Sequence, residues 1–261
     1  MTPPPAAHEQ GVARGSQVPW QARLLTLFPE VFPGVLGHSI AGRALSQGIW
    51  QLETVQIRDY ALDRHRSVDD SPSGGGSGMV MRADILGRVF DAVPRDLPMI
   101  YLSPRGARLT QRRVEQLAAG PGVTLLCGRF EGIDQRVIDE FALEELCLGE
   151  LVLSGGEIAA MALVDGCVRL LPGVLDKPEA TRDESFTAGV AEGFPGGLLE
   201  YPHYTRPPEW RGRTIPAVLL SGNHAAIAQW RREQSLGITA ARRPELLPPE
   251  LLLRINFCSG K

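Results

Sequence analysis

The chain of 261 residues has no long apolar run and almost no lysine. No apolar segment approaches the roughly 18 residues that a membrane-spanning helix needs. The N-terminus also lacks the basic and apolar regions of a secretion signal. We therefore expect a soluble, cytoplasmic protein. Its hydrophobic content of 43% is close to the globular average and can supply a sizeable core.

Several cysteine and glycine motifs are missing as well. The four cysteines (Cys127, Cys147, Cys167 and Cys258) show no C-x-x-C spacing, which disfavours a zinc ribbon or a redox dithiol and predicts free thiols. A P-loop requires G-x-x-x-x-G-K-[ST], and the only lysines, Lys177 and Lys261, lie outside that context. No G-x-G-x-x-G opens a helix near the N-terminus, which disfavours a dinucleotide-binding Rossmann fold.

The net charge of −3 conceals a local excess of positive charge near the C-terminus. Between residues 201 and 243, only Glu209 and Glu233 are acidic, whereas seven residues are arginine: Arg206, Arg211, Arg213, Arg231, Arg232, Arg242 and Arg243. Four aromatic residues lie among them: Tyr201, Tyr204, Trp210 and Trp230. This pattern is typical of a surface that holds an RNA loop with unstacked bases. A solvated, arginine-rich helix surface would account for some of the seven equally well.

Short apolar strands alternate with amphipathic helices in the first two thirds of the chain. Strands are expected at 23–28, 50–57, 99–102 and 123–127, with a further apolar stretch at 146–153. Helices are expected at 39–47, 85–93, around 114–117, and at 133–141 and 158–171. This alternation predicts an α/β domain with a mainly parallel sheet. Residues 58–78 read as a long polar loop, which is more often functional than decorative.

The composition divides the chain into four segments. Residues 1–21 are expected as a disordered tail, 22–175 as the α/β domain, 176–200 as a flexible interdomain linker and 201–261 as a small domain. In the last segment only helical patterns are evident, centred on 225–233 and 249–255.

Three glycine-containing loops each follow an expected apolar segment: 102–106, 127–132 and 153–157. An open α/β sheet binds its ligand at the carboxyl ends of its strands. Glycine there permits a positive φ and lets a ligand approach the main chain. The three loops together predict a nucleotide-like ligand, and the missing phosphate motifs favour one with an adenine but no phosphate anchor.

Further short motifs run through the chain in order. They are Phe28–Phe32 (FPEVF), Asp63–Asp70, Gly74–Met79, Tyr101–Pro104, Gly128–Asp134 (GRFEGID), Leu153–Glu157 (LSGGE), Pro172–Leu175, Pro202–Pro207 (PHYTRP) and Leu219–His224. In combination they resemble the bacterial tRNA (guanine-N1)-methyltransferases that act at position 37, 3′ of the anticodon. The resemblance covers about residues 22–247. It implies a SPOUT-type trefoil-knotted α/β domain with a small all-helical C-terminal domain. It also implies a homodimer with its active site between the subunits, and the tRNA anticodon stem-loop as partner.

The resemblance also implies S-adenosylmethionine as methyl donor, which carries a sulfonium and no phosphate. Its implied contacts are Tyr101, Leu102, Ser103, Pro104, Gly128, Phe130, Glu131, Gly132, Leu148, Gly149, Glu150, Leu151, Val152, Leu153, Gly155, Gly156 and Ala159. Phe130 stands where the family commonly has tyrosine, so ring stacking is retained without the hydroxyl. The family is associated with Mg²⁺, but no carboxylate cluster in the sequence identifies a metal site.

Methylation at guanine N1 requires a base for the N1 proton and a cation or donor at O6, where negative charge develops. By resemblance the base is the carboxylate before Ser185-Phe186. This is Glu184, where the family has aspartate, with Asp183 as the alternative. Arg169 is the implied electrostatic partner. Asp165, four residues earlier, would orient Arg169 or simply stabilise the helix, and unpaired burial among its apolar neighbours would be costly. The implied substrate contacts are Asp165, His203, Arg206, Asn223 and His224.

Two other functions are open at this point. A non-catalytic RNA-binding protein could retain the fold, with Phe130 and Glu184 marking a decayed site. A related methyltransferase could modify another RNA position, although the match extends through the C-terminal segment.

Overall fold

The computed structural model describes residues 18–250, without the side chains of 178–180. Within it the chain divides into two compact units at the junction of Asp176 and Lys177.

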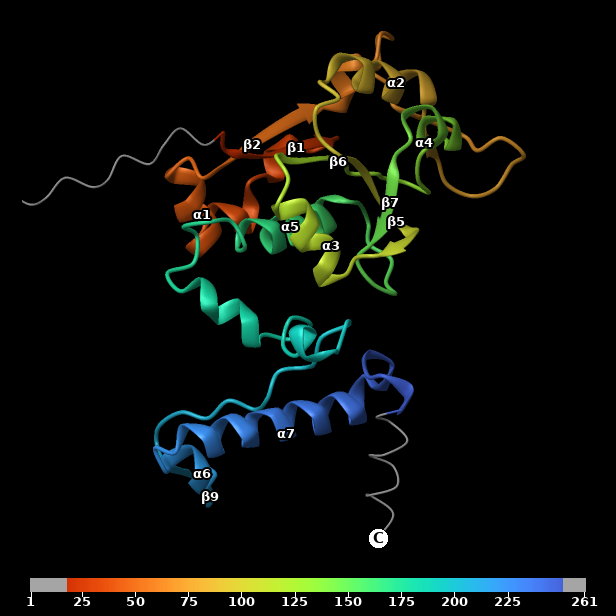
Figure 1. Ribbon diagram of the computed structural model, residues 1–261. Helices are drawn as coiled ribbons and strands as arrows, with labels where there is room; N and C mark the ends of the chain where they lie inside the picture. Colours follow the sequence, from red (N-terminus) through yellow and green to blue (C-terminus); the bar gives the residue numbers. More distant parts are fainter. Residues whose placement is uncertain (1–17, 251–261) are drawn as a thin grey trace, which may run out of the picture. The chain divides into compact units, whose positions relative to one another are not determined.

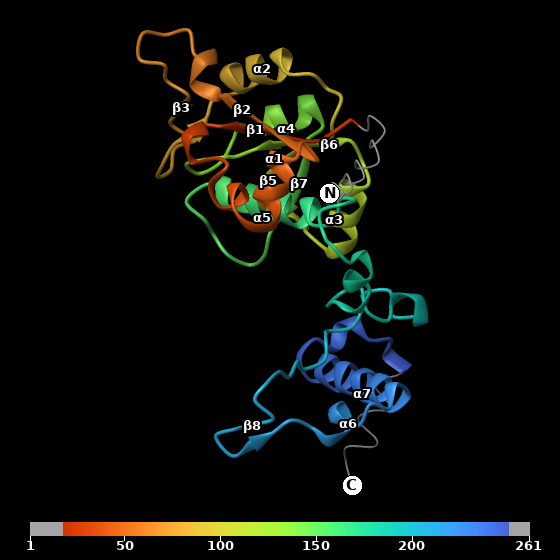
Figure 2. The same cartoon turned by 90° about the vertical axis from the view of Figure 1, so that its left-hand side faces the viewer.

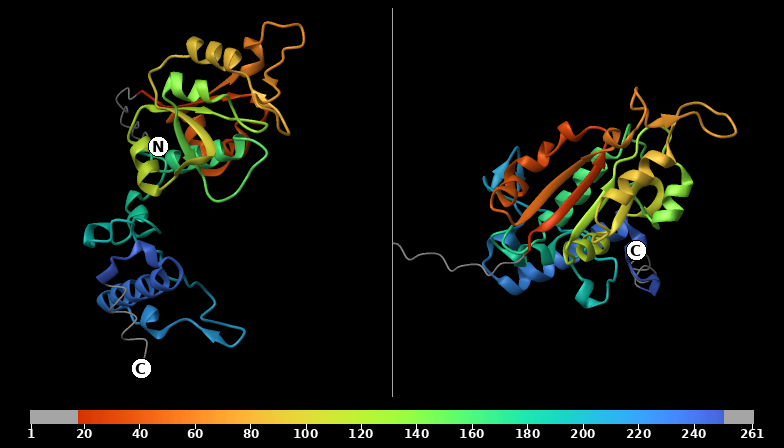
Figure 3. Two further views of the ribbon diagram at one scale, coloured as in Figure 1. Left: turned by 90° about the vertical axis from the view of Figure 1, so that its right-hand side faces the viewer. Right: turned by 90° about the horizontal axis from the view of Figure 1, so that it is seen from above.

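The first unit contains a five-stranded sheet in which every neighbouring pair is parallel (Figures 1 and 3). In spatial order its strands are β2 (Trp50–Gln56), β1 (Trp20–Thr26), β6 (Gly122–Leu126), β5 (Met99–Arg108) and β7 (Glu144–Cys147). The predicted α/β class with a mainly parallel sheet is confirmed.

Helices cover both faces of this sheet, as Figures 1 and 2 show. Because successive strand residues point to opposite faces, neighbouring leucines divide between two cores. Leu24 and Leu125 pack with α1 (Ser39–Ser46), α3 (Gln111–Ala118) and α5 (Glu157–Val168). Leu25 and Leu126 pack on the other face with α2 (Ala83–Ala92) and α4 (Gln135–Phe141). Two buried faces explain why these strands are continuously apolar rather than alternating.

Short elements complete the first unit. Three 3₁₀ turns span Pro29–Val31 (η1), Gly34–Gly37 (η2) and Ile57–Tyr60 (η3). Strands β3 (Asp69–Asp70) and β4 (Val80–Met81) pair antiparallel. The segment predicted as a polar loop at 58–78 therefore includes part of η3 and all of β3.

Three expectations about strands need correction. The ordered chain begins before Ala22, because Trp20 is only 4% exposed and its indole N–H donates to the Leu117 carbonyl at 3.1 Å. The strand expected at 99–102 continues to Arg108, with an irregular register between Leu102 and Ala107. Of the apolar stretch at 146–153 only the first two residues belong to a strand, and the rest form the loop before α5.

The second unit is built around α7 (His224–Arg242), which contains the helix predicted at 225–233. It also contains η4 (Pro178–Asp183), η5 (Val190–Glu192), α6 (Ala217–Leu220) and η6 (Pro244–Leu246). The helix predicted at 249–255 falls mostly outside the described residues.

The prediction of helices alone beyond residue 201 is wrong. β8 (Glu209–Trp210) and β9 (Arg213–Thr214) form an antiparallel hairpin. Its two turn residues, Arg211 and Gly212, have φ values of 51° and 74°. Positive φ at both positions is the geometry of the tight turns that match the twist of paired strands.

The segment expected as a flexible linker takes part in the core of the second unit. Phe194 and Leu198 are buried against Leu247. The Phe186 N–H donates to the Leu198 carbonyl at 2.9 Å, and the Glu200 N–H donates to Ser185 Oγ at 3.0 Å. Residues 185–200 are thus folded back on themselves rather than extended.

Candidate active site

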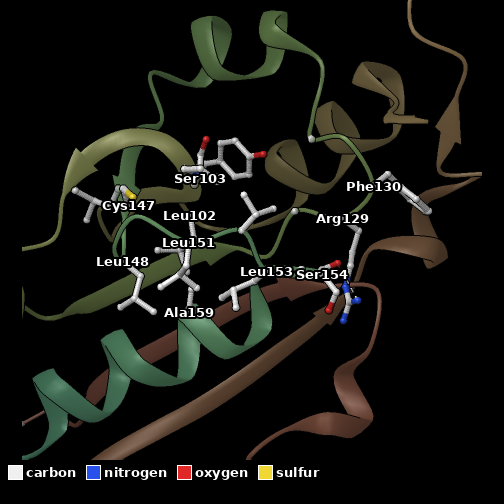
Figure 4. A pocket seen from close by; sticks show the side chains of 18 of the residues that line it. Leu102, Ser103, Arg129, Phe130, Cys147, Leu148, Leu151, Leu153, Ser154 and Ala159 are labelled. Carbon is white, nitrogen blue, oxygen red and sulfur yellow. Dashed lines mark hydrogen bonds between the residues drawn. The ribbon is translucent and has the colours of Figure 1, made fainter. Parts of the chain in front are cut away.

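Strand β5 itself and the loops that follow β6 and β7 line one pocket of about 180 Å³ (Figure 4). Its lining consists of Tyr101, Leu102, Ser103, Pro104, Gly128, Arg129, Phe130, Glu131, Gly132, Leu146, Cys147, Leu148, Gly149, Leu151, Val152, Leu153, Ser154, Gly155, Gly156 and Ala159. Parallel strands present their carboxyl ends at one edge of the sheet, so loops distant in sequence meet there.

The structure brings together every residue expected to contact the cofactor except Glu150, which is exposed and does not line the pocket. Four lining residues were missed by sequence reasoning: Arg129, Leu146, Cys147 and Ser154. Arg129 lies in the GRFEGID motif and Ser154 in the LSGGE motif. Their position in loops at strand ends could have identified them as pocket residues.

The pocket is mainly apolar at its centre. Leu102, Leu153 and Ala159 gather there in Figure 4. Leu102 and Ala159 are 8% and 6% exposed, whereas Leu151 and Val152 at the rim are 49% and 87% exposed. An apolar lining with a few polar groups is the usual make-up of a small-molecule site.

The glycines of these loops are required mainly by contact between loops. A Cβ on Gly156 would lie 2.7 Å from Cys127 Cα. The Gly156 N–H donates to the Gly128 carbonyl at 2.9 Å. A Cβ on Gly128 would lie 2.7 Å from the Tyr101 ring. Among the loop glycines that line the pocket only Gly132, with φ of 126°, has a positive φ. The expectation that positive φ explains these glycines is therefore wrong for most of them.

Two buried ionisable groups are Tyr101, which lines the pocket, and Cys127, which precedes Gly128 in the chain. Burial raises the pKa of the Tyr101 hydroxyl, and it raises the pKa of the Cys127 thiol well above its usual value. Cys127, Cys147 and Cys167 are free thiols as predicted, and Cys258 lies outside the described residues. The pocket wall thus presents the protonated phenol of Tyr101 next to the apolar centre.

A buried ion pair joins two of the loops. Arg129 Nη2 lies 2.9 Å from Glu157 Oε2, and the Glu157 side chain is only 5% exposed. Thr26 Oγ1 donates to Glu157 Oε1 at 2.8 Å, and Arg129 Nη1 donates to the Ser154 carbonyl at 3.2 Å. We call Thr26, Arg129 and Glu157 the clasp. It ties the end of β1, the loop after β6 and the first turn of α5 to one another.

Phe28 packs against the clasp. The Arg129 guanidinium lies 4.5 Å from the centre of the Phe28 ring, and the Phe28 N–H donates to Thr26 Oγ1 at 3.0 Å. A Cβ on Gly155 would lie 2.2 Å from Arg129 Nε, so glycine at this position makes room for the guanidinium. The FPEVF, GRFEGID and LSGGE motifs therefore meet at this arginine.

Phe130 lies at the edge of the pocket rather than in its centre. It is 48% exposed, its φ is 61°, and in Figure 4 its ring points away from the apolar side chains. A positive φ is unusual for a residue with a bulky side chain and marks a loop held in place by its surroundings. The Phe130 ring is accessible for stacking from outside.

The candidate catalytic residues belong to different units. Arg169 ends α5 and is half-buried, and its N–H donates to the Asp165 carbonyl at 3.1 Å. Asp165 itself is exposed, so the burial penalty considered for it does not arise. In the second unit, Glu184 is half-buried and its carbonyl accepts from the Ala188 N–H at 2.9 Å, whereas Asp183 is exposed.

The candidate RNA contacts of the second unit differ in their surroundings. His203 is exposed, and its Nε2 lies 2.8 Å from Glu200 Oε1. Arg206 and His224 are exposed. Asn223 is the N-cap of α7, where its side chain accepts from the Ala226 N–H at 3.2 Å. Asn223 therefore has a structural role that is sufficient to explain it.

Comparison with known proteins decides the family. The sequence model described as "tRNA (Guanine-1)-methyltransferase TrmD" matches residues 20–249. The chain belongs to this family. The resemblance predicted from the short motifs is confirmed, and with it the methyltransferase class and the SPOUT type of the α/β domain. The family match covers nearly all of the described residues.

Three relatives are each named "tRNA (guanine-N(1)-)-methyltransferase". The protein of Rhodopseudomonas palustris (strain TIE-1) is 61% identical over 87% of this chain and 89% of its own length. That of Nitrobacter winogradskyi is 58% identical over 87% and 92%. That of Gluconobacter oxydans is 55% identical over 87% and 94%. The shared region includes both units of the chain. Among residues 18–250, no helix has the length and apolar character to cross a membrane.

Proposed function

We propose that this protein transfers a methyl group from S-adenosylmethionine to N1 of the guanine at position 37 of tRNA. The observation that carries the proposal is the meeting of β5 and the glycine-containing loops after β6 and β7 around one apolar pocket, in a chain of this family. A tRNA substrate would place the activity in the cytoplasm.

The lining of the pocket suits this methyl donor. S-adenosylmethionine, when bound, supplies a methyl group on a positively charged sulfur and leaves as a neutral thioether. The apolar side chains around Leu102 and Ala159 would surround the adenine, with main-chain groups of the loops available to its polar edge. Glu131 is the one carboxylate among the described lining residues and would attract the donor's positive charges.

Cys147 offers a direct test of donor binding. This half-buried thiol lines the pocket and donates to the Gly149 carbonyl at 3.0 Å. Cys127 and Cys167 are buried, and burial raises the pKa of Cys167 to about 12, so both resist alkylation. We expect iodoacetamide to label Cys147, and saturating S-adenosylmethionine to slow that labelling by at least about tenfold at 100 times Kd. Peptide mass spectrometry measures it, and labelling unchanged by the donor would contradict binding in this pocket.

At the acceptor, Glu184 is the proposed general base. Its carboxylate accepts the proton of guanine N1 as N1 bonds to the methyl carbon, so the ring gains no net positive charge. Arg169 donates toward O6, where negative charge gathers as the proton leaves. The backbone around Glu184 supports this role, because hydrogen bonds to its carbonyl from Thr187 and Ala188 hold the turn in shape. Asp183 is the alternative base.

A metal site is not assigned. Within residues 18–250 there is no group of three or more His, Cys, Asp and Glu residues placed to hold an ion. No step of the proposed reaction is derived through magnesium.

A homodimer with the active site between subunits completes the proposal, together with the knot that the family resemblance predicts. Several apolar side chains at or beside the pocket rim are solvent-exposed: Phe130, Leu148, Leu151, Val152 and Ile158 at 48%, 36%, 49%, 87% and 60%. Exposed apolar side chains grouped in this way are typical of a surface that a partner covers. A second copy would cover the rim and bring its own 176–200 segment, with Glu184, to the site.

The proposed function is tested with labelled S-adenosylmethionine and two tRNA transcripts that differ only at position 37. We expect methyl transfer to the transcript with guanosine there and none to the transcript with adenosine, because adenine N1 carries no proton and its neighbour O6 is absent. Nuclease digestion and chromatography identify the product as N1-methylguanosine. Transfer to both transcripts would move the target to another position, and transfer to neither would favour an RNA-binding protein without activity.

A further inference from the structure

The second unit has a pocket of its own, of about 210 Å³, whose lining includes four aromatic rings and an arginine. Tyr201, His203 and Tyr204 come from the segment before the hairpin, and Trp230 and Arg231 from α7. Ile227, one turn before Arg231 on the same helix, contributes to its apolar floor. We call it the aromatic pocket. All its lining residues lie between Tyr201 and Arg231, far along the chain from the glycine loops.

The rings of the aromatic pocket pack in two tilted pairs. Tyr204 and Trp230 have their centroids 6.2 Å apart and their planes tilted by 60°, and Tyr201 and His203 are 5.1 Å apart with a tilt of 52°. Tyr204 is 48% exposed and Trp230 is half-buried. A tilted pair leaves ring faces uncovered, and the exposed ring of Tyr204 offers its π-face to a planar ligand, as in the stacking platforms of single-strand-binding proteins.

The charge around the pocket favours a polyanion. The Arg231 guanidinium lies 4.7 Å from the centre of the Tyr201 ring and forms part of the wall. Arg232 pairs with Glu192, and Arg243 with Glu245. By contrast, within the described part of the chain Arg206 and Arg231 form no ion pair with a carboxylate. Guanidinium groups without such a partner are available to phosphate oxygens.

Aromatic grooves also bind proline-rich peptides, which gain nothing from a positive surrounding. Seven arginines against two glutamates between residues 201 and 243 favour a chain of phosphates instead. We propose that the aromatic pocket receives one unpaired base of the RNA, distinct from the methylated guanine, stacked on the exposed ring of Tyr204 beside Trp230, with Arg231 at the adjoining phosphate. This inference rests on the proposed function, because it takes the RNA to be tRNA.

Tryptophan fluorescence can isolate this pocket. The chain has four tryptophans, of which Trp20 and Trp50 are 4% and 0% exposed and Trp210 is 59% exposed on the hairpin. In Trp210→Phe, Trp230 is the tryptophan left with solvent access. A base stacked beside it, on Tyr204, quenches its emission, and no methyl donor is needed for the measurement.

The experiment titrates the Trp210→Phe protein with an anticodon stem-loop RNA and with the same RNA carrying one abasic site at each unpaired position in turn. We expect one abasic position other than the methylation target to remove the quenching and weaken binding by about 5- to 150-fold, the usual effect of one stacked base. Tyr204→Ala should weaken binding of the intact RNA to a similar extent, and Tyr204→Phe should leave it unchanged.

The outcomes separate this inference from the proposed function. If methyl transfer is normal and no abasic position alters the quenching, the aromatic pocket does not receive a base and only the inference fails. If one position controls the quenching while no transfer occurs, the inference stands and the proposed reaction fails. Quenching by a proline-rich peptide, with none by the RNA, would identify a protein partner and overturn the inference.

Discussion

Replacing Glu184 with glutamine is expected to lower the rate of methyl transfer by about 10²- to 10⁴-fold, the usual contribution of a general base. Glutamine keeps the size of the side chain and its ability to hydrogen-bond, but it cannot accept the N1 proton. Binding of S-adenosylmethionine should be unchanged, because the pocket is formed by other residues. Single-turnover assays measure the first effect and titration calorimetry the second.

Asp183→Asn is the matched control for this experiment. Asp183 is the neighbouring carboxylate and is exposed, so its loss should alter the rate by less than Glu184→Gln does. Glu184→Asp should retain part of the activity, since aspartate keeps the carboxylate on a side chain one methylene shorter. A normal rate in Glu184→Gln together with a large loss in Asp183→Asn would transfer the role of base to Asp183.

The Glu184→Gln variant also tests whether the active site is shared between subunits. Gly149→Trp should fill the pocket without disturbing its backbone, because a Cβ there meets only the Leu151 side chain, at 3.5 Å. If Glu184 acts across a twofold dimer, mixing Glu184→Gln with Gly149→Trp protein should restore about a quarter of the activity, since half of the random dimers have one intact site. No recovery, or a monomeric mass by light scattering, would contradict the shared site.

The second large effect is expected at the clasp. Arg129→Met should lower the free energy of unfolding by about 3–5 kcal/mol, because it leaves the Glu157 carboxylate buried without its cation. The loop that carries Gly128 and Phe130 should also lose its connection to Ser154, and donor affinity with it. Urea denaturation measures the first effect and calorimetry the second.

Two further variants make the clasp experiment decisive. Arg105→Met removes an ion pair with Glu145 beside the same pocket, but Arg105 is 63% exposed, so the expected loss is at most about 1 kcal/mol. Adding Glu157→Gln to Arg129→Met removes the stranded charge and keeps an acceptor for Thr26, so most of the stability should return. Equal losses in the single and double variants would mean that packing, not charge, makes Arg129 necessary.

Sequence patterns predicted the first unit well where the signal was local. The continuous apolar runs around Leu24 and Leu125 indicated buried parallel strands, and the three loops after such runs indicated the edge at which the pocket lies. The hairpin at Glu209–Thr214 was missed because each strand has only two residues, too few for a period of two to be seen. The packing of Phe194 and Leu198 was missed because glycine and proline around them suggested an open connector.

The amino-acid order by itself determined the family, the parallel α/β class and which loops could meet a ligand, because these depend on motifs and on periodicity within single segments. Only the tertiary structure decided why the glycines are there and what Arg129 does. The carboxylate of Glu157, the hydroxyl of Thr26 and the ring of Phe28 come from three different segments of the chain. Their meeting depends on strand order in the sheet, β2-β1-β6-β5-β7, which no local pattern encodes.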